Sequence, residues 1–149
     1  MTYQISKDEL KELFGDGYDE AYEVEAEQRW GETEAWAQSR ARTSRYTKQD
    51  WAAIKAEGEA VMLAFAAVLD AGEPATSEAA MDAAEAHRRQ INDRFYDLGY
   101  PMHRGLADMY LADPRFTATY EAVRPGLAQY VHDAVHANAD RHEGRPTSH

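Results

Sequence analysis

The residue pair best suited to metal chemistry is formed by His132 and His136. The segment His-Asp-Ala-Val-His sets two imidazoles one helical turn apart, which resembles the H-E-x-x-H motif of zinc enzymes. Asp133 is one methylene shorter than the glutamate base of that motif, and no third ligand is evident. The two histidines also flank the expected core face of their helix. We therefore predict no metal ion and no cofactor.

No other pattern of catalytic type stands out. The sequence contains no ordered Ser, His and Asp series, no phosphate-binding loop and no spaced pair of carboxylates. It also contains no cysteine, which excludes disulfides, thiolate metal sites and chemistry through a thiol. We therefore expect no catalytic residues and a protein that is not an enzyme.

Aromatic residues gather around a break in the helical pattern, within the stretch RFYDLGYPMHRGLADMYLADPRF (94–116). Gly99 and Pro101 interrupt one helix and suit the start of another. Phe95 continues the apolar stripe of the preceding helix, which favours a core position, whereas Tyr96 lies off that stripe. A polar turn alone would not need aromatics beside it, so we predict that the break forms a pocket.

The elements that must position these residues are all helical. Apolar residues recur at helical spacing, Ser or Thr caps precede the patterns, and Gly or Pro follows them. No strand-like alternation and no internal repeat is found, so the fold class is all-α. We expect helices over residues 6–13, 19–30, 33–42, 47–71, 77–97, 101–111, 113–120 and 124–139, and a disordered tail from about Asp140.

Composition bounds the class of protein. The 149 residues fit one domain, and 44% hydrophobic residues suffice for a core. No apolar run is long enough to span a membrane, and the first residues lack the apolar segment of a signal peptide, so we expect a cytoplasmic protein. The formal charge of -11 argues against nucleic-acid binding by this chain. Nothing resembles a coiled-coil seam, and we expect a monomer.

Residues 1–45 differ from the rest of the chain. Residues 1–34 hold 11 Asp and Glu against 3 Lys and Arg. Residues 1–45 hold six aromatic residues but few aliphatic ones. Such a segment buries too little apolar surface to offset an ordering entropy of about 1–2 kcal/mol per residue. We expect it to fold only against the remaining helices or against a ligand.

Three stretches together resemble one protein family, the TipAS antibiotic-recognition domain of MerR-type drug-sensing regulators. They are QRWGETEAW (28–36), YTKQDWAAIKAE (46–57) and the series from RRQINDRFYDLGYPMH to HDAVHANA (88–139). The resemblance implies a globin-like helical bundle with a helix-break cleft and a flexible N-terminal lid. It divides the chain into a domain over 1–142, with an acidic lid (1–45) and a helical core (46–142), and a disordered tail (143–149).

The resemblance also implies a function, which is reversible binding of thiopeptide-type macrocyclic antibiotics for sequestration or sensing. The family's founding member carries cysteines at the positions of Leu98 and Gly105, and the second captures a dehydroalanine of the drug. Because neither thiol is present here, binding is expected to be reversible. The regulators place a DNA-binding domain before this one, and we expect this chain to lack it. The expected ligand-binding residues are Tyr18, Tyr22, Trp30, Trp36, Tyr96, Leu98, Gly99, Tyr100, Met102, His103, Gly105 and Tyr110.

Several of these residues have a plainer interpretation as core or packing residues, and two other functions stay open. A globin-like fold could hold haem or a metal through His87 or His103, although a histidine between Ala84 and Ile91 on an apolar face is usually a hydrogen-bonded core residue. Alternatively, the acidic N-terminal segment could dock on a basic partner protein. Salt-sensitive association would support that alternative, since an apolar cleft should tolerate salt.

Overall fold

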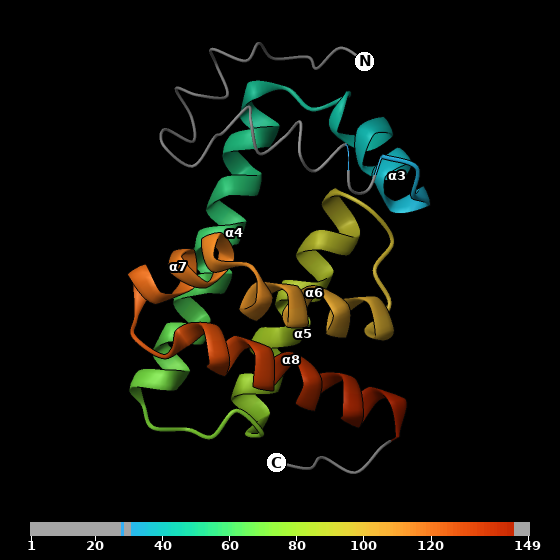
Figure 1. The fold of residues 1–149 in the computed structure, drawn as a ribbon. Coiled ribbons are helices and arrows are strands. Elements are labelled where there is room, and N and C mark those ends of the chain that lie inside the picture. Colours follow the sequence, from blue (N-terminus) through green and yellow to red (C-terminus); the bar gives the residue numbers. More distant parts are fainter. Residues whose placement is uncertain (1–27, 29–30, 145–149) are drawn as a thin grey trace. The chain divides into compact units, whose positions relative to one another are not determined.

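The computed structural model describes residue 28 and residues 31–144 (Figure 1). Within these residues the chain forms helices and no strand, which confirms the all-α prediction. The helices expected over 6–13 and 19–30, and the tail residues 145–149, lie outside the described residues. The described helices are α3 (Glu34–Thr43), α4 (Lys48–Asp70), α5 (Glu78–Arg94), α6 (Tyr100–Ala112), α7 (Pro114–Val123) and α8 (Leu127–Glu143).

Serine and threonine caps fix where three of these helices begin. The hydroxyl oxygen of Thr33 accepts a hydrogen bond from the Trp36 amide at 3.1 Å at the start of α3. At the start of α4, Thr47 accepts from the Asp50 amide while the Asp50 carboxylate accepts from the Thr47 amide, a reciprocal capping box. Ser77 accepts from the Ala80 amide at α5. All three caps agree with the sequence prediction.

The described chain divides into two compact units, which we describe separately. The first unit holds residues 28, 31–57 and 91–97. In it, the Trp51 ring lies 5.7 Å from the Tyr46 ring and 6.3 Å from the Phe95 ring, measured between centroids. These aromatics, with the buried Ile54, form its packed centre.

The second unit holds residues 58–90 and 98–144 and contains the main hydrophobic core. There α6 packs against α8, and α7 packs against both. Alanines are frequent at the buried positions of α5, α6 and α8, and their small side chains let helices approach closely. The larger buried side chains of this core are Phe65, Tyr110, Tyr120, Leu127, Tyr130, Val131 and Val135.

Four helix boundaries lie three or more residues from the prediction, at the ends of α5 and α7 and at both ends of α8. α5 ends at Arg94 and not near Asp97, because the amides of Phe95 and Tyr96 both donate to the carbonyl of Ile91 and close the helix there. The end of α7 and the start of α8 are also shifted: α7 continues to Val123 rather than Tyr120, and α8 begins at Leu127, not at 124.

The ends of α8 have clear local causes. Gly126 has φ +85°, a left-handed conformation that suits glycine, and the Glu121 carboxylate accepts hydrogen bonds from the amides of Gly126 and Ala128. At the other end, α8 runs to Glu143 and Gly144 closes it with φ +74°. The expectation of a disordered tail from Asp140 is therefore wrong for residues 140–143.

A search of the described helices for one long and apolar enough to cross a lipid bilayer finds none.

Candidate functional site

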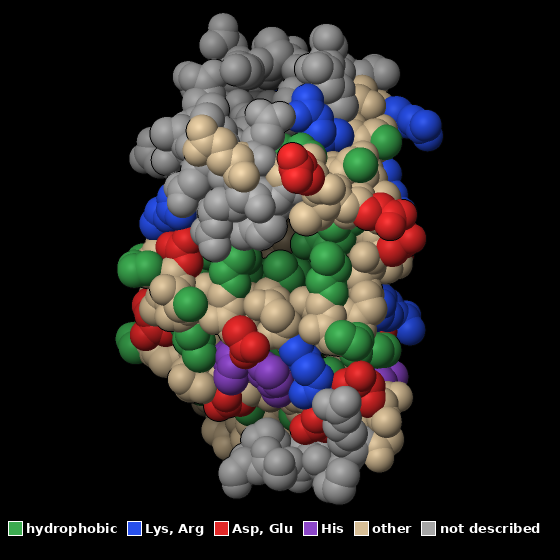
Figure 2. Space-filling model, turned by 45° about the vertical axis from the view of Figure 1, so that its right-hand side comes forward, with side chains coloured by type: hydrophobic (Ala, Val, Ile, Leu, Met, Phe, Trp, Pro, Cys, Tyr) green, Lys and Arg blue, Asp and Glu red, His purple; other side chains and the backbone are tan. Residues whose placement is uncertain are grey.

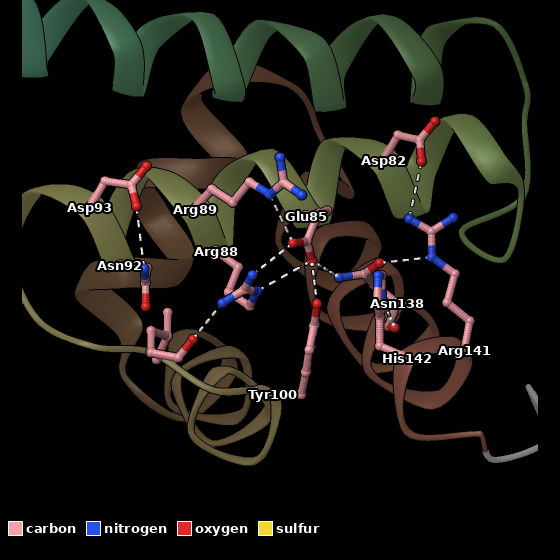
Figure 3. Close-up of polar contacts among 11 residues, drawn as sticks. Asp82, Glu85, Arg88, Arg89, Asn92, Asp93, Tyr100, Asn138, Arg141 and His142 are labelled. Atoms are coloured by element: carbon pink, nitrogen blue, oxygen red, sulfur yellow. Dashed lines mark hydrogen bonds and ion pairs between the residues drawn. The ribbon is translucent and has the colours of Figure 1, made fainter.

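The helix break leads directly into a polar cluster around Glu85 of α5 (Figure 3). The Glu85 side chain is only 12% exposed, and Arg88 forms an ion pair with it at 2.7 Å. Arg88 also donates to the carbonyl of Leu98 at 2.7 Å, which fixes the break against α5. Asn138 of α8 donates to Glu85 at 3.0 Å. The cluster therefore joins α5, the break and α8.

Tyr100, a predicted ligand-binding residue, belongs to this cluster. Its hydroxyl donates to Glu85 at 3.1 Å. Its ring stacks on the imidazole of His142, with centroids 4.6 Å apart, and the Arg88 guanidinium lies 4.6 Å from its centroid. Both the hydroxyl and the ring faces of Tyr100 thus have partners inside the second unit.

The electrostatics of the cluster favour a charged Glu85. Burial alone would raise the pKa of this carboxyl, but the hydrogen bonds from Arg88 and Asn138 outweigh that effect and lower the pKa to about 2. Burial raises the pKa of Tyr100, and the negative charge of Glu85 raises it further. The tyrosine therefore stays protonated and acts as a donor.

A second face of α6 is closed within the core. Leu98, which precedes α6, is 1% exposed, and His103 and Tyr110 are also buried. Nδ1 of His87 lies 2.8 Å from Nε2 of His103, and their rings are stacked. Nδ1 of His103 is buried without a hydrogen-bond partner. These residues line no exposed surface.

Burial sets the charge of this histidine pair. Desolvation lowers the pKa of His87 to about 4, and desolvation together with the neighbouring His87 lowers the pKa of His103 to about 3. Both imidazoles are therefore neutral at neutral pH. As predicted, His87 is a hydrogen-bonded histidine and not an iron ligand facing open space: its partner is His103, and it is half-buried.

The outer face of α6 is open. Met102 is 45% exposed, Gly105 is exposed, and Leu106 and Met109 are half-buried. A Cβ atom at Gly105 would meet no other heavy atom within 4 Å. The positions 102, 105, 106 and 109 follow helical spacing, so they form one stripe. We call these four residues the α6 stripe. Hydrophobic side chains reach the surface on the face drawn in Figure 2.

When the sequence is compared with known protein families, it matches the model of one of them. The sequence model of the TipAS antibiotic-recognition domain matches residues 22–138. The chain belongs to the TipAS family. It is similar to the HTH-type transcriptional activator TipA of Streptomyces coelicolor, with 49% identity over 142 residues. That match covers 95% of this chain and 56% of the relative, so the chain spans little more than half of the regulator's length.

Two solved structures resemble the fold of this TipAS-family chain. One is TipAS of Streptomyces lividans in complex with the thiopeptide nosiheptide; it is 48% identical, covers 94% of this chain and 98% of its own, and gives a TM-score of 0.85. The other is the antibiotic-binding domain of a TipA-class multidrug resistance transcriptional regulator. It is 53% identical, covers 60% of this chain and 95% of its own, and gives a TM-score of 0.56.

The remaining site predictions for this TipAS-family domain fall in the first unit or outside the described residues. Trp36 on α3 and Tyr96 after α5 are both half-buried in the first unit, and burial raises the pKa of Tyr96. Tyr18, Tyr22 and Trp30 lie outside the described residues. Gly99 is exposed and precedes α6 as its N-cap. Gly99, Tyr100, Met102 and Gly105 are thus all at the start of α6, where Tyr100 joins the Glu85 cluster while Met102 and Gly105 lie on the outer face.

Sequence reasoning missed two polar groups of this TipAS-family fold. Glu85 carries a weak local signal, since Arg88 and Arg89 follow at helical spacings of three and four residues. Arg104 carries no local signal, because its partners Asp140 and Glu143 lie on α8, at 2.6 Å and 2.7 Å.

His132 and His136, for which the sequence shows no third ligand, both lie beside a carboxylate in the structure. Asp108 of α6 places its Oδ1 atom 2.9 Å from Nε2 of His132 and 2.8 Å from Nε2 of His136.

Proposed function

We propose that this chain binds thiopeptide-type macrocyclic antibiotics reversibly and without chemical conversion. The observation that carries the proposal is its likeness to TipAS in complex with nosiheptide, at 48% identity over 94% of this chain with a TM-score of 0.85. At that identity and coverage, the ligand class of the relative is the strongest guide to the ligand class of this domain.

The α6 stripe supports the proposal from the structure. Two thioethers and a leucine surround Gly105, and methionine side chains adapt to irregular apolar shapes. Burial of such surface contributes about 25 cal/mol per Å² of apolar area. A large ligand with aromatic rings therefore gains affinity by covering this stripe, and the open space over Gly105 lets it approach the helix backbone.

Reversibility follows from the residues at two positions. Leu98 is a buried aliphatic side chain, and Gly105 has no side chain. Neither offers a nucleophile to an electrophilic ligand, and the chain has no cysteine elsewhere. The proposed use is sequestration of the antibiotic, or sensing of it where the domain is joined to a DNA-binding domain, as in the regulators that it resembles.

The test is a nosiheptide titration of the chain and of three variants by isothermal calorimetry. Gly105→Phe fills the open space over α6, and Met102→Glu places a charge on the stripe. We expect each substitution to weaken nosiheptide binding about tenfold or more. Burying a new charge, or pushing the ligand away from the helix, should lower the binding free energy by at least about 1.4 kcal/mol. Ala118→Phe adds the same ring on an exposed position of α7 and should bind like the parent. Parent affinity in both stripe variants, with folded helical spectra, would refute the α6 stripe.

The lid is a separate part of the proposal, which rests on the family resemblance. If residues 1–45 close over the bound antibiotic, hydrogen exchange should slow in that segment when nosiheptide is added. Binding with unchanged exchange in residues 1–45 would remove the lid and leave the α6 stripe untouched.

The haem alternative gains no support from the histidine pair. His87 and His103 face each other through ring nitrogens 2.8 Å apart, and His103 is fully buried. An iron ligand needs a free nitrogen directed at an open space. Haem titration without a new visible absorption band would argue against this alternative.

A further inference from the structure

We propose that Asp108, His132 and His136 bind one divalent transition-metal ion, with zinc as the expected occupant. The three ligand atoms, one from each side chain, lie within 4.8 Å of one another. His132 and His136 come from neighbouring turns of α8, and Asp108 comes from α6. On the face shown in Figure 2, histidine side chains lie at the surface beside carboxylates and an arginine.

The present distances between Asp108 and the two histidines are close to the spacing of ligand atoms around a metal ion. Oδ1 of Asp108 is 2.9 Å and 2.8 Å from the two Nε2 atoms. Zinc binds nitrogen and oxygen ligands at about 2.0–2.2 Å, so neighbouring ligand atoms in a tetrahedral site are about 3.3 Å apart. The two oxygen–nitrogen distances therefore need to lengthen by only about half an ångström, with the metal replacing the protons in these two contacts.

The surroundings of His132 favour replacement of its Nε2 hydrogen bond by a bond to a metal ion. Its Nδ1 lies 2.9 Å from a carboxylate oxygen of Asp133, the arrangement in which a carboxylate holds the N–H of a metal-bound imidazole. When Nδ1 donates its hydrogen to Asp133, Nε2 is the nitrogen that faces the proposed position of the metal ion.

His136 has a different neighbour. Its Nδ1 lies 3.2 Å from Nη1 of Arg104, a group that can only donate. When Nε2 binds a metal, Nδ1 carries the proton, so this contact has to lengthen. Arg104 remains held by Asp140 and Glu143 through shorter contacts. The change thus costs one weak hydrogen bond and leaves the ion pairs intact.

The ligand chemistry selects the class of metal. Two imidazoles and one carboxylate suit zinc, nickel or copper, whereas magnesium and calcium prefer oxygen ligands. The side chains of His132, His136 and Asp108 are 23%, 26% and 61% exposed, so an ion can enter from solvent. Three protein ligands leave the remaining positions for water. Because the ligands come from α6 and α8, the ion would join the two helices and stabilise the second unit.

The test uses the full chain after treatment with a chelator, at neutral pH. Zinc affinity is measured by competition with a chromophoric chelator, and cobalt is added in parallel to record its visible spectrum. We expect one zinc per chain, no competition by magnesium, a cobalt spectrum of low coordination number, and a higher melting temperature with zinc.

Substitutions test whether Asp108 and His136 bind the metal ion. Asp108→Asn and His136→Gln should each weaken zinc binding about tenfold or more, whereas Glu78→Gln, which removes an exposed carboxylate of α5, should not. Histidine ring signals in NMR give a readout that does not depend on variants: zinc should shift those of His132 and His136 and leave His87 and His103 in place. Absence of saturable binding, equal affinity in the ligand variants, or shifts at other histidines would overturn the proposal.

Discussion

At the scale of single residues, Tyr100 is both a predicted ligand-binding residue and a residue with contacts that hold the fold together. Its position at the helix break suggested a residue of the ligand pocket. In the structure its hydroxyl donates to Glu85 and its ring lies against Arg88 and His142. Removing the ring would therefore disturb the fold as well as any ligand contact, and Tyr100→Ala cannot separate the two roles.

Tyr100→Phe separates them. The substitution keeps the ring and removes one hydrogen bond to a charged acceptor, so we expect the free energy of unfolding to fall by about 1–2 kcal/mol. Urea unfolding followed by circular dichroism measures this change. Nosiheptide affinity should stay near that of the parent if the hydroxyl serves the fold alone. Unchanged stability would show that the Glu85 contact contributes nothing, and a large loss of affinity would place the hydroxyl in the binding site.

The limits of sequence reasoning are clearest for residues whose partners are far along the chain. Asp108 stands between Leu106 and Met109 and gives no sign of the histidines on α8, which follow 24 and 28 residues later. Asp140 and Glu143 look like solvated polar residues, yet both pair with Arg104 on α6. Only the packing of α6 on α8 brings these groups together, and no local pattern encodes it.

At the scale of helices, prediction succeeded where the determinants are local. The Ser and Thr caps expected before the helical patterns are Thr33, Thr47 and Ser77, and Asp113 caps α7 at the expected helix start. The ends were less accurate. α8 extends beyond the expected end because Gly144 supplies the closing left-handed residue and the last turn is bound to Arg104.

The attachment of α3 is an element-scale feature that the sequence did not indicate. Arg42 donates to the carbonyl of Asn92 and forms an ion pair with Asp97, both at 2.7 Å. Gln38 accepts from the Asp97 amide at 2.9 Å. Within the first unit, α3 is thus held to the segment that follows α5. The described part of the predicted lid therefore already has specific contacts.

Arg42→Met should release α3. The substitution removes the guanidinium while keeping much of the aliphatic stem, so the contacts with Asn92 and Asp97 are lost. We expect faster amide exchange in α3 with unchanged exchange in α6 and α8, measured by mass spectrometry. Arg45→Met, an exposed position with the same change of charge, is the control. Equal exchange in α3 of both variants would mean that other contacts hold the helix.

At the scale of the whole molecule, buried ionisable groups predict how stability depends on pH. The pKa of His87 is about 4 and that of His103 about 3 in the fold, against 6.5 in an unfolded chain. Below pH 6.5 the unfolded state takes up protons that the folded state does not, so stability is lost as the pH falls from 6.5 toward these values. Glu85 adds to the loss between its ordinary pKa of 4.5 and about 2.

We therefore expect acid to destabilise the protein well before its carboxylates are fully protonated. Between pH 6.5 and pH 5, the lowered pKa of His87 alone corresponds to a loss on the order of 2 kcal/mol in the free energy of unfolding. Urea midpoints measured from neutral pH down to about pH 5 should fall steadily, with the decline starting near the histidine range. The histidine ring signals of His87 and His103 should stay those of neutral imidazoles in the folded protein. Constant midpoints over this range would contradict the burial of the pair.

The last turn of α8 has a practical consequence for fragment design. The family match stops at residue 138, whereas the helix continues to Glu143 and Gly144 closes it. A protein cut at the alignment boundary would lose both carboxylates that neutralise Arg104 and would leave a half-buried guanidinium facing the trimmed end. Crystallographers and assay developers should therefore place the stop codon after Gly144, beyond the boundary of the family match.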